Sequence, residues 1–292
     1  MIEYDYPLFR PPAEANNVIL QVTHGCSYNN CSFCSMYKTK SYEARTLEDI
    51  FFDIDALSQY YPNANKVFLA DGDALSLEAE FLLKILRYLQ EKFVKLSRVS
   101  TYASAQNILK KSHKELVELK ELKLNLLYYG IETGSEVVLK KITKGVTKEE
   151  IIDSLNSASE AGMKISATVI LGIGGELYSK EHIQESADII NSTKVTYLST
   201  LQLGLEEDAK ENFYKHFSDF KALGDDEILS EQKKFIELLE PKNRIIFRSN
   251  HASNALHLAG TLPKDKDRLL KEINYAMSIG EEAYVPSMFR GF

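Results

Sequence analysis

Short apolar runs alternate along the chain with longer segments in which apolar residues recur every three or four positions. The short runs end at glycine or polar residues, a pattern typical of buried β-strands. The longer segments have the period of amphipathic α-helices. The pattern predicts strands at residues 18–23, 66–70, 96–101, 124–129, 164–171, 195–203 and 243–247, and helices at 46–61, 75–93, 114–119, 147–161, 180–190, 207–239 and 266–278.

This alternation predicts the fold class. Strands separated by helices of this length are joined as parallel strands through right-handed crossovers. We therefore expect an α/β fold, a partial (β/α)6 TIM-like barrel of parallel strands with a C-terminal helical extension and a short seventh strand. The expected divisions are an extended N-terminal arm at 1–17, the barrel at 18–205, and a C-terminal extension at 206–292 that could cover the substrate site.

Polar and glycine-containing segments follow most of the predicted strands. In barrels of this kind, the loops after the strands build the site at the C-terminal face. We therefore expect these segments to converge over the mouth of the barrel, together with the loop after the first strand. The segments are Asp71-Gly72-Asp73, Ser104-Ala105-Gln106, Glu132-Thr133, Gly172-Ile173-Gly174-Gly175-Glu176 and Arg248-Ser249-Asn250-His251.

All three cysteines of the chain, Cys26, Cys31 and Cys34, lie in the loop after the first strand. Thiolates are the ligands of iron–sulfur clusters and of soft or borderline metals. The C-x4-C-x2-C spacing, with Phe33 before the last cysteine, predicts the cradle of a single iron–sulfur cluster. Two alternatives remain open. One is a zinc-stabilised binding module with His24 as the fourth ligand, and the other is a non-enzymatic electron carrier or sensor with the same residue on its cluster.

Net charge and composition limit the kinds of partner that we expect for this protein. The formal net charge is −7, and no basic block gives a reason to expect nucleic acid or an anionic membrane. No run approaches the ~18 apolar residues of a membrane span, and the first residues lack the pattern of a signal peptide. Three clustered cysteines do not form a disulfide framework. We expect a cytoplasmic protein that works where oxygen is scarce, with no nucleic-acid or membrane partner.

On its cysteine motif and the ordered βα units behind it, the chain resembles the radical S-adenosylmethionine (radical SAM) enzymes over about residues 15–250. The first gap has one residue more than the common C-x3-C-x2-C spacing. The resemblance implies that Cys26, Cys31 and Cys34 ligate a 4Fe-4S cluster whose fourth iron binds SAM. An external donor of flavodoxin or ferredoxin type would supply the electron that cleaves SAM. The resulting 5′-deoxyadenosyl radical would abstract hydrogen from a small-molecule substrate.

The same resemblance implies roles in cofactor binding for residues outside the cysteine loop. Phe33 would lie near the adenine, and Asp71-Gly72-Asp73 would hold the SAM amino group. Glu132 would hold the ribose hydroxyls, and Gly172-Ile173 would approach the adenine; Ser104 is a further candidate. Simpler roles are open for the acidic residues, because Asp71 and Asp73 could favour a following helix and Glu132 could cap one.

Candidate substrate-binding residues are assigned only from their place in the sequence, in the N-terminal arm or after a predicted strand. Arg10, Arg248, Asn250 and His251 are candidates, although the last three could belong to a polar loop that satisfies its own backbone. Because all three cysteines are used, we expect no second Cys-ligated cluster, which argues against methylthiotransferases. The segments after the cysteine motif also resemble a group related to oxygen-independent coproporphyrinogen oxidases, without implying their substrate.

Overall fold

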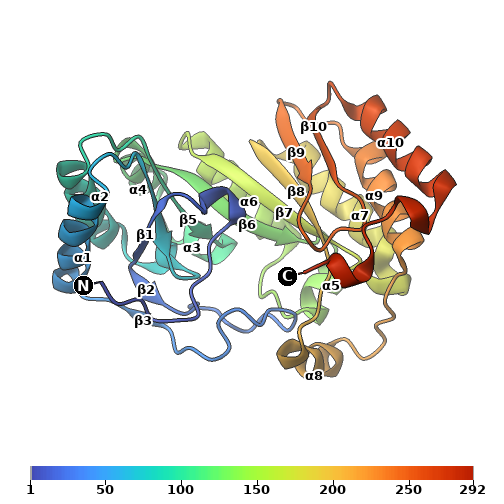
Figure 1. The fold of residues 1–292 in the computed structure, drawn as a ribbon, viewed down its shortest axis with the longest axis horizontal. Coiled ribbons are helices and arrows are strands. Elements are labelled where there is room, and N and C mark those ends of the chain that lie inside the picture. Colours follow the sequence, from blue (N-terminus) through green and yellow to red (C-terminus); the bar gives the residue numbers. More distant parts are fainter. Residues whose placement is uncertain (1, 292) are drawn as a thin grey trace. The chain divides into compact units, whose positions relative to one another are not determined.

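The computed structural model describes residues 2–291 and consists of two compact units. The first unit is built from Met1–Asn29, Cys34–Tyr129 and Asn156–Ile165, and the second from Asn30–Phe33, Gly130–Leu155 and Ser166–Phe292. Strands and helices alternate along the sequence in both units (Figure 1).

The first unit contains parallel strands in the order β1, β4, β5, β6. The register pairs Val18 with Val67, and Val67 with Val99. Most residues of these strands are buried, including the polar Ser100 and Thr101 of β5, as in parallel sheets covered by helices. Their bounds are β1 Val18–Gln21, β4 Lys66–Ala70, β5 Arg98–Ala103 and β6 Leu124–Glu132, of which the last three residues belong to the second unit.

Helices cover these strands. Helix α1 packs against β1 and α2, and α2 packs against α4 (Figure 1). Thr46 begins α1 by accepting a hydrogen bond from the backbone N–H of Asp49, and Ser112 and Glu115 form a capping box at α4. The bounds are η1 Pro12–Glu14, α1 Leu47–Tyr60, η2 Ala74–Ser76, α2 Ala79–Lys92, α3 Ala105–Leu109 and α4 His113–Glu121.

The second unit repeats the alternation. Strands β7, β8 and β9 are parallel, and β10 is antiparallel to β9. Helix α9 packs against α7 and α10, and α10 packs against β10. The strands are β7 Lys164–Leu171, which begins in the first unit, β8 Tyr197–Gln202, β9 Ile245–Ser249 and β10 Leu258–Leu262. The helices are α5 Glu136–Lys141, α6 Lys148–Glu160, which belongs to the first unit from Asn156 on, α7 Gly175–Ser192, α8 Glu207–His216, α9 Asp225–Leu238, α10 Lys266–Ile279, η3 Glu281–Ala283 and η4 Ser287–Phe289.

The expected mostly parallel α/β fold is confirmed, with local differences. Strand β10 was not expected, because its five residues include Gly260, and a glycine inside so short a run is typical of a turn. Helix α3 was not expected, because it is a short helix inside a polar segment. The predicted helix at 75–93 is interrupted at Leu77, which is extended. The division at residues 17/18 and 205/206 stays a prediction. Within residues 2–291, no helix is both long and apolar enough to cross a membrane.

The N-terminal segment is tied to the first unit by a buried carboxylate. Glu14 is fully buried; Arg98 and the Tyr128 hydroxyl each donate a hydrogen bond of 2.6 Å to its Oε1 atom. Asn17 donates to the other carboxylate oxygen. A buried charge is tolerated only when it is paired in this way. Glu14 thereby fixes residues 12–17 to the start of β5 and to β6.

We expect Glu14→Ala to lower the free energy of unfolding by about 2 kcal/mol, because Arg98 and Tyr128 lose their shared acceptor. This loss of stability is smaller than that expected for a fully buried ion pair, because the Arg98 side chain is 23% exposed. Urea denaturation followed by circular dichroism measures it. Glu80→Ala, which removes an exposed ion pair with Lys84, is the control and is expected to change nothing measurable. Equal stability of the Glu14 variant and the control would contradict this role.

Candidate functional site

The loop that carries the cysteines is closed at its base by a two-stranded antiparallel ladder, β2 Thr23–His24 and β3 Glu43–Ala44. Cys26, Cys31 and Cys34 are all partly buried. The loop begins at Gly25, whose φ of +67° lies in the left-handed region that favours glycine.

Asp71, at the end of β4, holds the start of this loop. Its Oδ2 atom accepts hydrogen bonds from the backbone N–H of Gly25 at 3.0 Å and from the Lys40 ammonium at 2.8 Å. Lys40 is 5% exposed and also forms a 2.9 Å ion pair with Asp5. The Asp71 side chain is fully buried, and its Oδ1 atom has no hydrogen-bond partner among residues 2–291. One carboxylate oxygen therefore stays available as an acceptor beside the cysteine loop.

Asp73 joins the cysteine loop to the segment after β5. Its carboxylate accepts hydrogen bonds from the Ser27 hydroxyl and from the Asn107 amide of α3. Burial raises the pKa of Asp73, although these hydrogen bonds oppose the shift. Ser104 caps α3 by accepting from the backbone N–H of Asn107. Ser104 therefore caps α3, and it is Asn107, not Ser104, that forms the hydrogen bond to Asp73.

In the second unit, Phe33 and Glu132 lie close to the same cation. The Lys144 ammonium is 2.8 Å from Glu132 Oε1 and 5.9 Å from the centroid of the Phe33 ring. Glu132 has a φ of +62°, an uncommon conformation for a non-glycine residue and one that is concentrated at functional sites. Gly130 is required beside it, because a Cβ there would collide with the Glu132 carboxylate.

Phe33 and Ile173 pack in one hydrophobic cluster of the second unit. Phe33 lies against its surface, whereas Ile173 is fully buried within it. The Asn30–Phe33 segment is held by two hydrogen bonds, from the backbone N–H of Ser32 to Ile142 O and from the Thr143 hydroxyl to Asn30 O. The other members of the cluster are Val138, Ile142, Ile170, Phe213, Phe217 and Phe220.

The glycine turn after β7 is fixed by a buried carboxylate. Gly172, with a φ of +79°, donates its backbone N–H to Glu231 Oε2 at 2.5 Å. The Ser179 hydroxyl donates to Glu231 Oε1 at 2.8 Å. Glu231 is 4% exposed, and burial raises its pKa to about 7. Its place in α9 ties that helix to the turn.

The loop after β9 is anchored by Asn254 rather than by the residues expected to contact substrate. The buried Asn254 side chain accepts from the backbone N–H of Gln202 at 2.7 Å and donates to Thr200 O at 2.9 Å. Asn250 is exposed, and His251 pairs through Nδ1 with the Ser253 hydroxyl at 2.9 Å. The loop thus satisfies part of its own hydrogen bonding, as the simpler interpretation expected.

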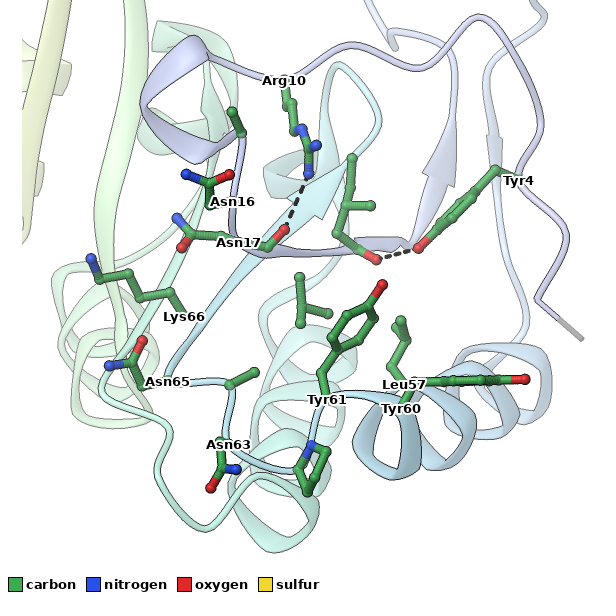
Figure 2. A pocket seen from close by; sticks show the side chains of 15 residues that line it. Tyr4, Arg10, Asn16, Asn17, Leu57, Tyr60, Tyr61, Asn63, Asn65 and Lys66 are labelled. Carbon is green, nitrogen blue, oxygen red and sulfur yellow. Dashed lines mark hydrogen bonds between the residues drawn. The ribbon is translucent and has the colours of Figure 1, made fainter.

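The two arginines expected to contact substrate are engaged elsewhere. Arg248 donates to the backbone carbonyls of Phe247 and Gly260 on β9 and β10. Arg10 donates to Asn17 O at 3.1 Å and lines an open groove of 650 Å³ (Figure 2). That groove is lined by Val18 and Lys66, the first residues of β1 and β4, whereas the cysteine loop follows the other end of β1. The structure does not bring Arg10 to the cysteine loop.

Within residues 2–291, no three His, Cys, Asp or Glu side chains are arranged to hold a metal ion. The donor set nevertheless fits an iron–sulfur cluster, since three thiols occur on one short loop and a buried, unpartnered carboxylate oxygen lies beside that loop. Sequence reasoning missed Lys40, Asn107, Lys144 and Glu231, each of which binds a residue 12 to 59 positions away. No local pattern could have revealed these pairs.

Comparisons with known proteins point to one family. Residues 20–189 match the family model described as the radical SAM superfamily. The chain is 26% identical to a Methanocaldococcus jannaschii protein named provisionally as a methylthiotransferase, over 71% of this chain and 49% of that protein. It is 24% identical to the heme chaperone HemW of Bacillus subtilis (63% and 48%) and 24% identical to tRNA-2-methylthio-N(6)-dimethylallyladenosine synthase of Petrotoga mobilis (66% and 44%). The chain spans about half the length of these curated relatives or less.

Solved structures show the same fold. Coproporphyrinogen III oxidase from Escherichia coli, a radical SAM enzyme, superposes with a TM-score of 0.55 at 14% identity, covering 76% of this chain and 51% of that one. The cobalamin-dependent radical SAM enzyme OxsB superposes with a TM-score of 0.52 at 19% identity, covering 69% and 30%. At these identities the likeness concerns the fold, and it agrees with the expected partial TIM-like barrel.

We expect the stability of the protein to depend on the ionisation of Glu231. Its folded-state pKa of about 7 exceeds the ordinary value of 4.5, so the stability it contributes is present below pH 4.5 and is lost as pH rises to 7. The loss is about 3 kcal/mol. Glu231→Gln cannot ionise and keeps an oxygen for Gly172, so relative to wild type it gains stability between pH 4.5 and 7.5.

Urea denaturation across this pH range measures the difference. Glu160→Gln, at an exposed position of α6, is the matched control and should follow wild type at every pH. A Glu231→Gln variant whose difference from wild type stays constant with pH would show that this carboxyl titrates normally.

Proposed function

The chain belongs to the radical SAM superfamily, and we propose that it is an enzyme that cleaves S-adenosylmethionine reductively to abstract hydrogen from a small-molecule substrate. Members of this superfamily use a 4Fe-4S cluster and SAM, which confirms the cofactors expected from the sequence. The observation that carries the proposal is the cysteine loop, which lies inside the matched residues and is held by Asp71 and Asp73 at the end of β4.

We assign Cys26, Cys31 and Cys34 as the cluster ligands. A 4Fe-4S cluster has four irons, and residues 1–292 contain three cysteines, so one iron is left for SAM. A cluster held by these three cysteines would supply the electron for reductive cleavage of SAM, and the 5′-deoxyadenosyl radical released with methionine would abstract the substrate hydrogen. An external electron donor of flavodoxin or ferredoxin type is part of the proposal, as is a cytoplasmic, oxygen-poor setting that keeps the thiols reduced.

Asp71 is the residue of the Asp71-Gly72-Asp73 segment that we assign to the SAM amino group. Its Oδ1 atom is a buried acceptor without a partner in residues 2–291, and an ammonium group would satisfy it. Both oxygens of Asp73, in contrast, accept from Ser27 and Asn107. Asp73 therefore positions the cysteine loop, while Asp71 binds the cofactor.

We assign the contacts to the nucleoside of SAM to Glu132, Phe33 and the Gly172-Ile173 turn. Glu132, held by Lys144 in a strained conformation, is the acceptor assigned to the ribose hydroxyls. Phe33 offers a partly buried aromatic face for the adenine. We also assign the Gly172-Ile173 turn to the adenine; Glu231 fixes its backbone, and the side of Gly172 that would carry a Cβ packs against Ile228.

A small-molecule substrate is favoured over nucleic acid. Some relatives have tRNA in their names, but the net charge of −7 gives no reason to expect a nucleic-acid partner. A second Cys-ligated cluster cannot form within residues 1–292, since the three cysteines are already assigned. For substrate contact we retain Asn250 and His251, on the loop anchored by Asn254, because Arg10 and Arg248 bind backbone carbonyls elsewhere.

Anaerobic reconstitution with iron and sulfide, followed by reduction in the presence of SAM, tests the function. Wild-type protein is expected to bind about four irons and to release 5′-deoxyadenosine, measured by mass spectrometry. Cys31→Ala is expected to lose the cluster and the product while keeping its circular dichroism, because strands and helices form the core. Ser35→Ala, in the same loop, is the matched control and is expected to keep both the cluster and the release of 5′-deoxyadenosine.

The alternatives predict different results from the same samples. A colourless protein with stoichiometric zinc would support a zinc-stabilised module. A loaded, reduced wild-type cluster that leaves SAM intact would support an electron carrier or sensor.

Asp71→Asn is expected to weaken SAM binding to the loaded enzyme about tenfold, which is about 1.4 kcal/mol, because a neutral amide replaces the charged acceptor of the ammonium. Lys40 keeps its ion pair with Asp5, so cluster content should be unchanged. Equilibrium dialysis with labelled SAM measures the affinity. Asp55→Asn, at a surface ion pair with Lys92, is the control. Wild-type affinity in Asp71→Asn would remove Asp71 from the SAM site.

A further inference from the structure

Glu132, the acceptor assigned to the ribose hydroxyls, is the central residue of a γ-turn. The backbone N–H of Thr133 donates a 2.8 Å hydrogen bond to Ile131 O, two residues back, and the φ of Glu132 is +62°. A turn closed in this way at positive φ is rare and strained for a residue with a side chain. Such a conformation persists only where the surrounding structure holds it. Contacts of the neighbouring residues must therefore hold Glu132 in this turn.

The segment after Glu132 is bound to helix α7 at every residue. Each of its three residues forms a hydrogen bond with a side chain of that helix: Thr133 with His182 at 2.8 Å, Gly134 with Ser186 at 2.9 Å and Ser135 with Glu181 at 2.6 Å. All of these residues except Glu181 are buried. The backbone of Gly134 packs directly on the helix, because a Cβ there would lie 2.3 Å from the Glu185 backbone. Helix α7 therefore fixes the segment that follows the strained turn.

His182 lies at the centre of these contacts and is fully buried. Its Nδ1 atom faces the hydroxyls of Thr133 at 2.8 Å and Ser186 at 3.4 Å, and both oxygens accept from backbone N–H groups of residues 134–135. Burial lowers the pKa of His182 to about 3, so the ring is neutral and has one acceptor nitrogen. We assign Nδ1 as the acceptor of the Thr133 proton. The His182 side chain also packs against Gly174, where a Cβ would lie 3.1 Å from the His182 Cβ.

We propose that His182 is a positioning residue that, through the Thr133 hydroxyl, holds Glu132 in its γ-turn and so directs the Glu132 carboxylate to the ribose hydroxyls of SAM. The inference rests on the proposed function, because it requires Glu132 to bind the ribose. Lys144 holds the end of the Glu132 side chain at 2.8 Å, whereas His182 acts on the adjoining backbone. Without the His182 contact the strained turn relaxes, and the carboxylate moves away from the ribose.

Equilibrium dialysis of the loaded enzyme with labelled SAM and with its labelled 2′,3′-dideoxy analogue tests this role. The analogue lacks both hydroxyls that Glu132 would bind, so its affinity should not depend on the turn. His182→Leu is expected to weaken SAM binding about tenfold and to leave the affinity for the analogue unchanged. A general structural defect would weaken the binding of both ligands alike. Equal losses for both ligands, or no loss for SAM, overturn the proposal.

Thr133→Val removes the partner of His182 while keeping the shape of the side chain, so it should show the same selective loss. This second variant decides the question if His182→Leu does not fold. Thr193→Val is the matched control, because Thr193 is a fully buried threonine at the C-terminal end of α7 whose hydroxyl donates to Ile189 O. Its affinities for both ligands should equal those of wild type.

Cluster content and release of 5′-deoxyadenosine by the wild type separate this inference from the proposed function. A wild type without cluster or product refutes the proposed function, and with it this role of His182. An active wild type that binds SAM and the analogue equally removes Glu132 from the ribose and overturns the inference. An active wild type that prefers SAM, with His182 and Thr133 variants that keep this preference, refutes the inference alone.

Discussion

A buried negative charge that must be paired, Asp71, organises the candidate site of the first unit. A carboxylate removed from water is tolerated only with compensating donors, and here these are the Gly25 backbone and Lys40. The first donor fixes where the cysteine loop leaves β2. The second reaches Asp5 in the N-terminal segment. One carboxylate therefore connects the loop that carries the cysteines, the end of β4 and the first residues of the chain.

Buried carboxylates fix the other loops in the same way. Asp73 connects the cysteine loop to α3, Glu132 is paired with Lys144 at the end of β6, and Glu231 holds the glycine turn after β7. In each case a polar segment follows a strand, and a hydrogen-bond donor or acceptor distant in the sequence fixes the conformation of that segment. Each of these pairings fixes the conformation of its loop within its own unit.

Three buried polar atoms in or near the cysteine loop lack partners in residues 2–291: Asp71 Oδ1, Ser32 Oγ and the Tyr37 hydroxyl. Asp71 Oδ1 is an acceptor, which suits an ammonium group, whereas the two hydroxyls can donate.

Local sequence patterns determined the alternation of strands and helices and the three-cysteine loop. Hydrophobic periodicity and ligand spacing depend on residues a few positions apart, so both can be read without a structure. Tertiary structure alone decided the partners: Lys40 for Asp71, Arg98 for Glu14 and Glu231 for Gly172. It also added β10, whose sequence contains Gly260, and α3, which is a short helix inside a polar segment. Pairing of buried charges depends on which side chains the fold brings together, and no local pattern encodes that proximity.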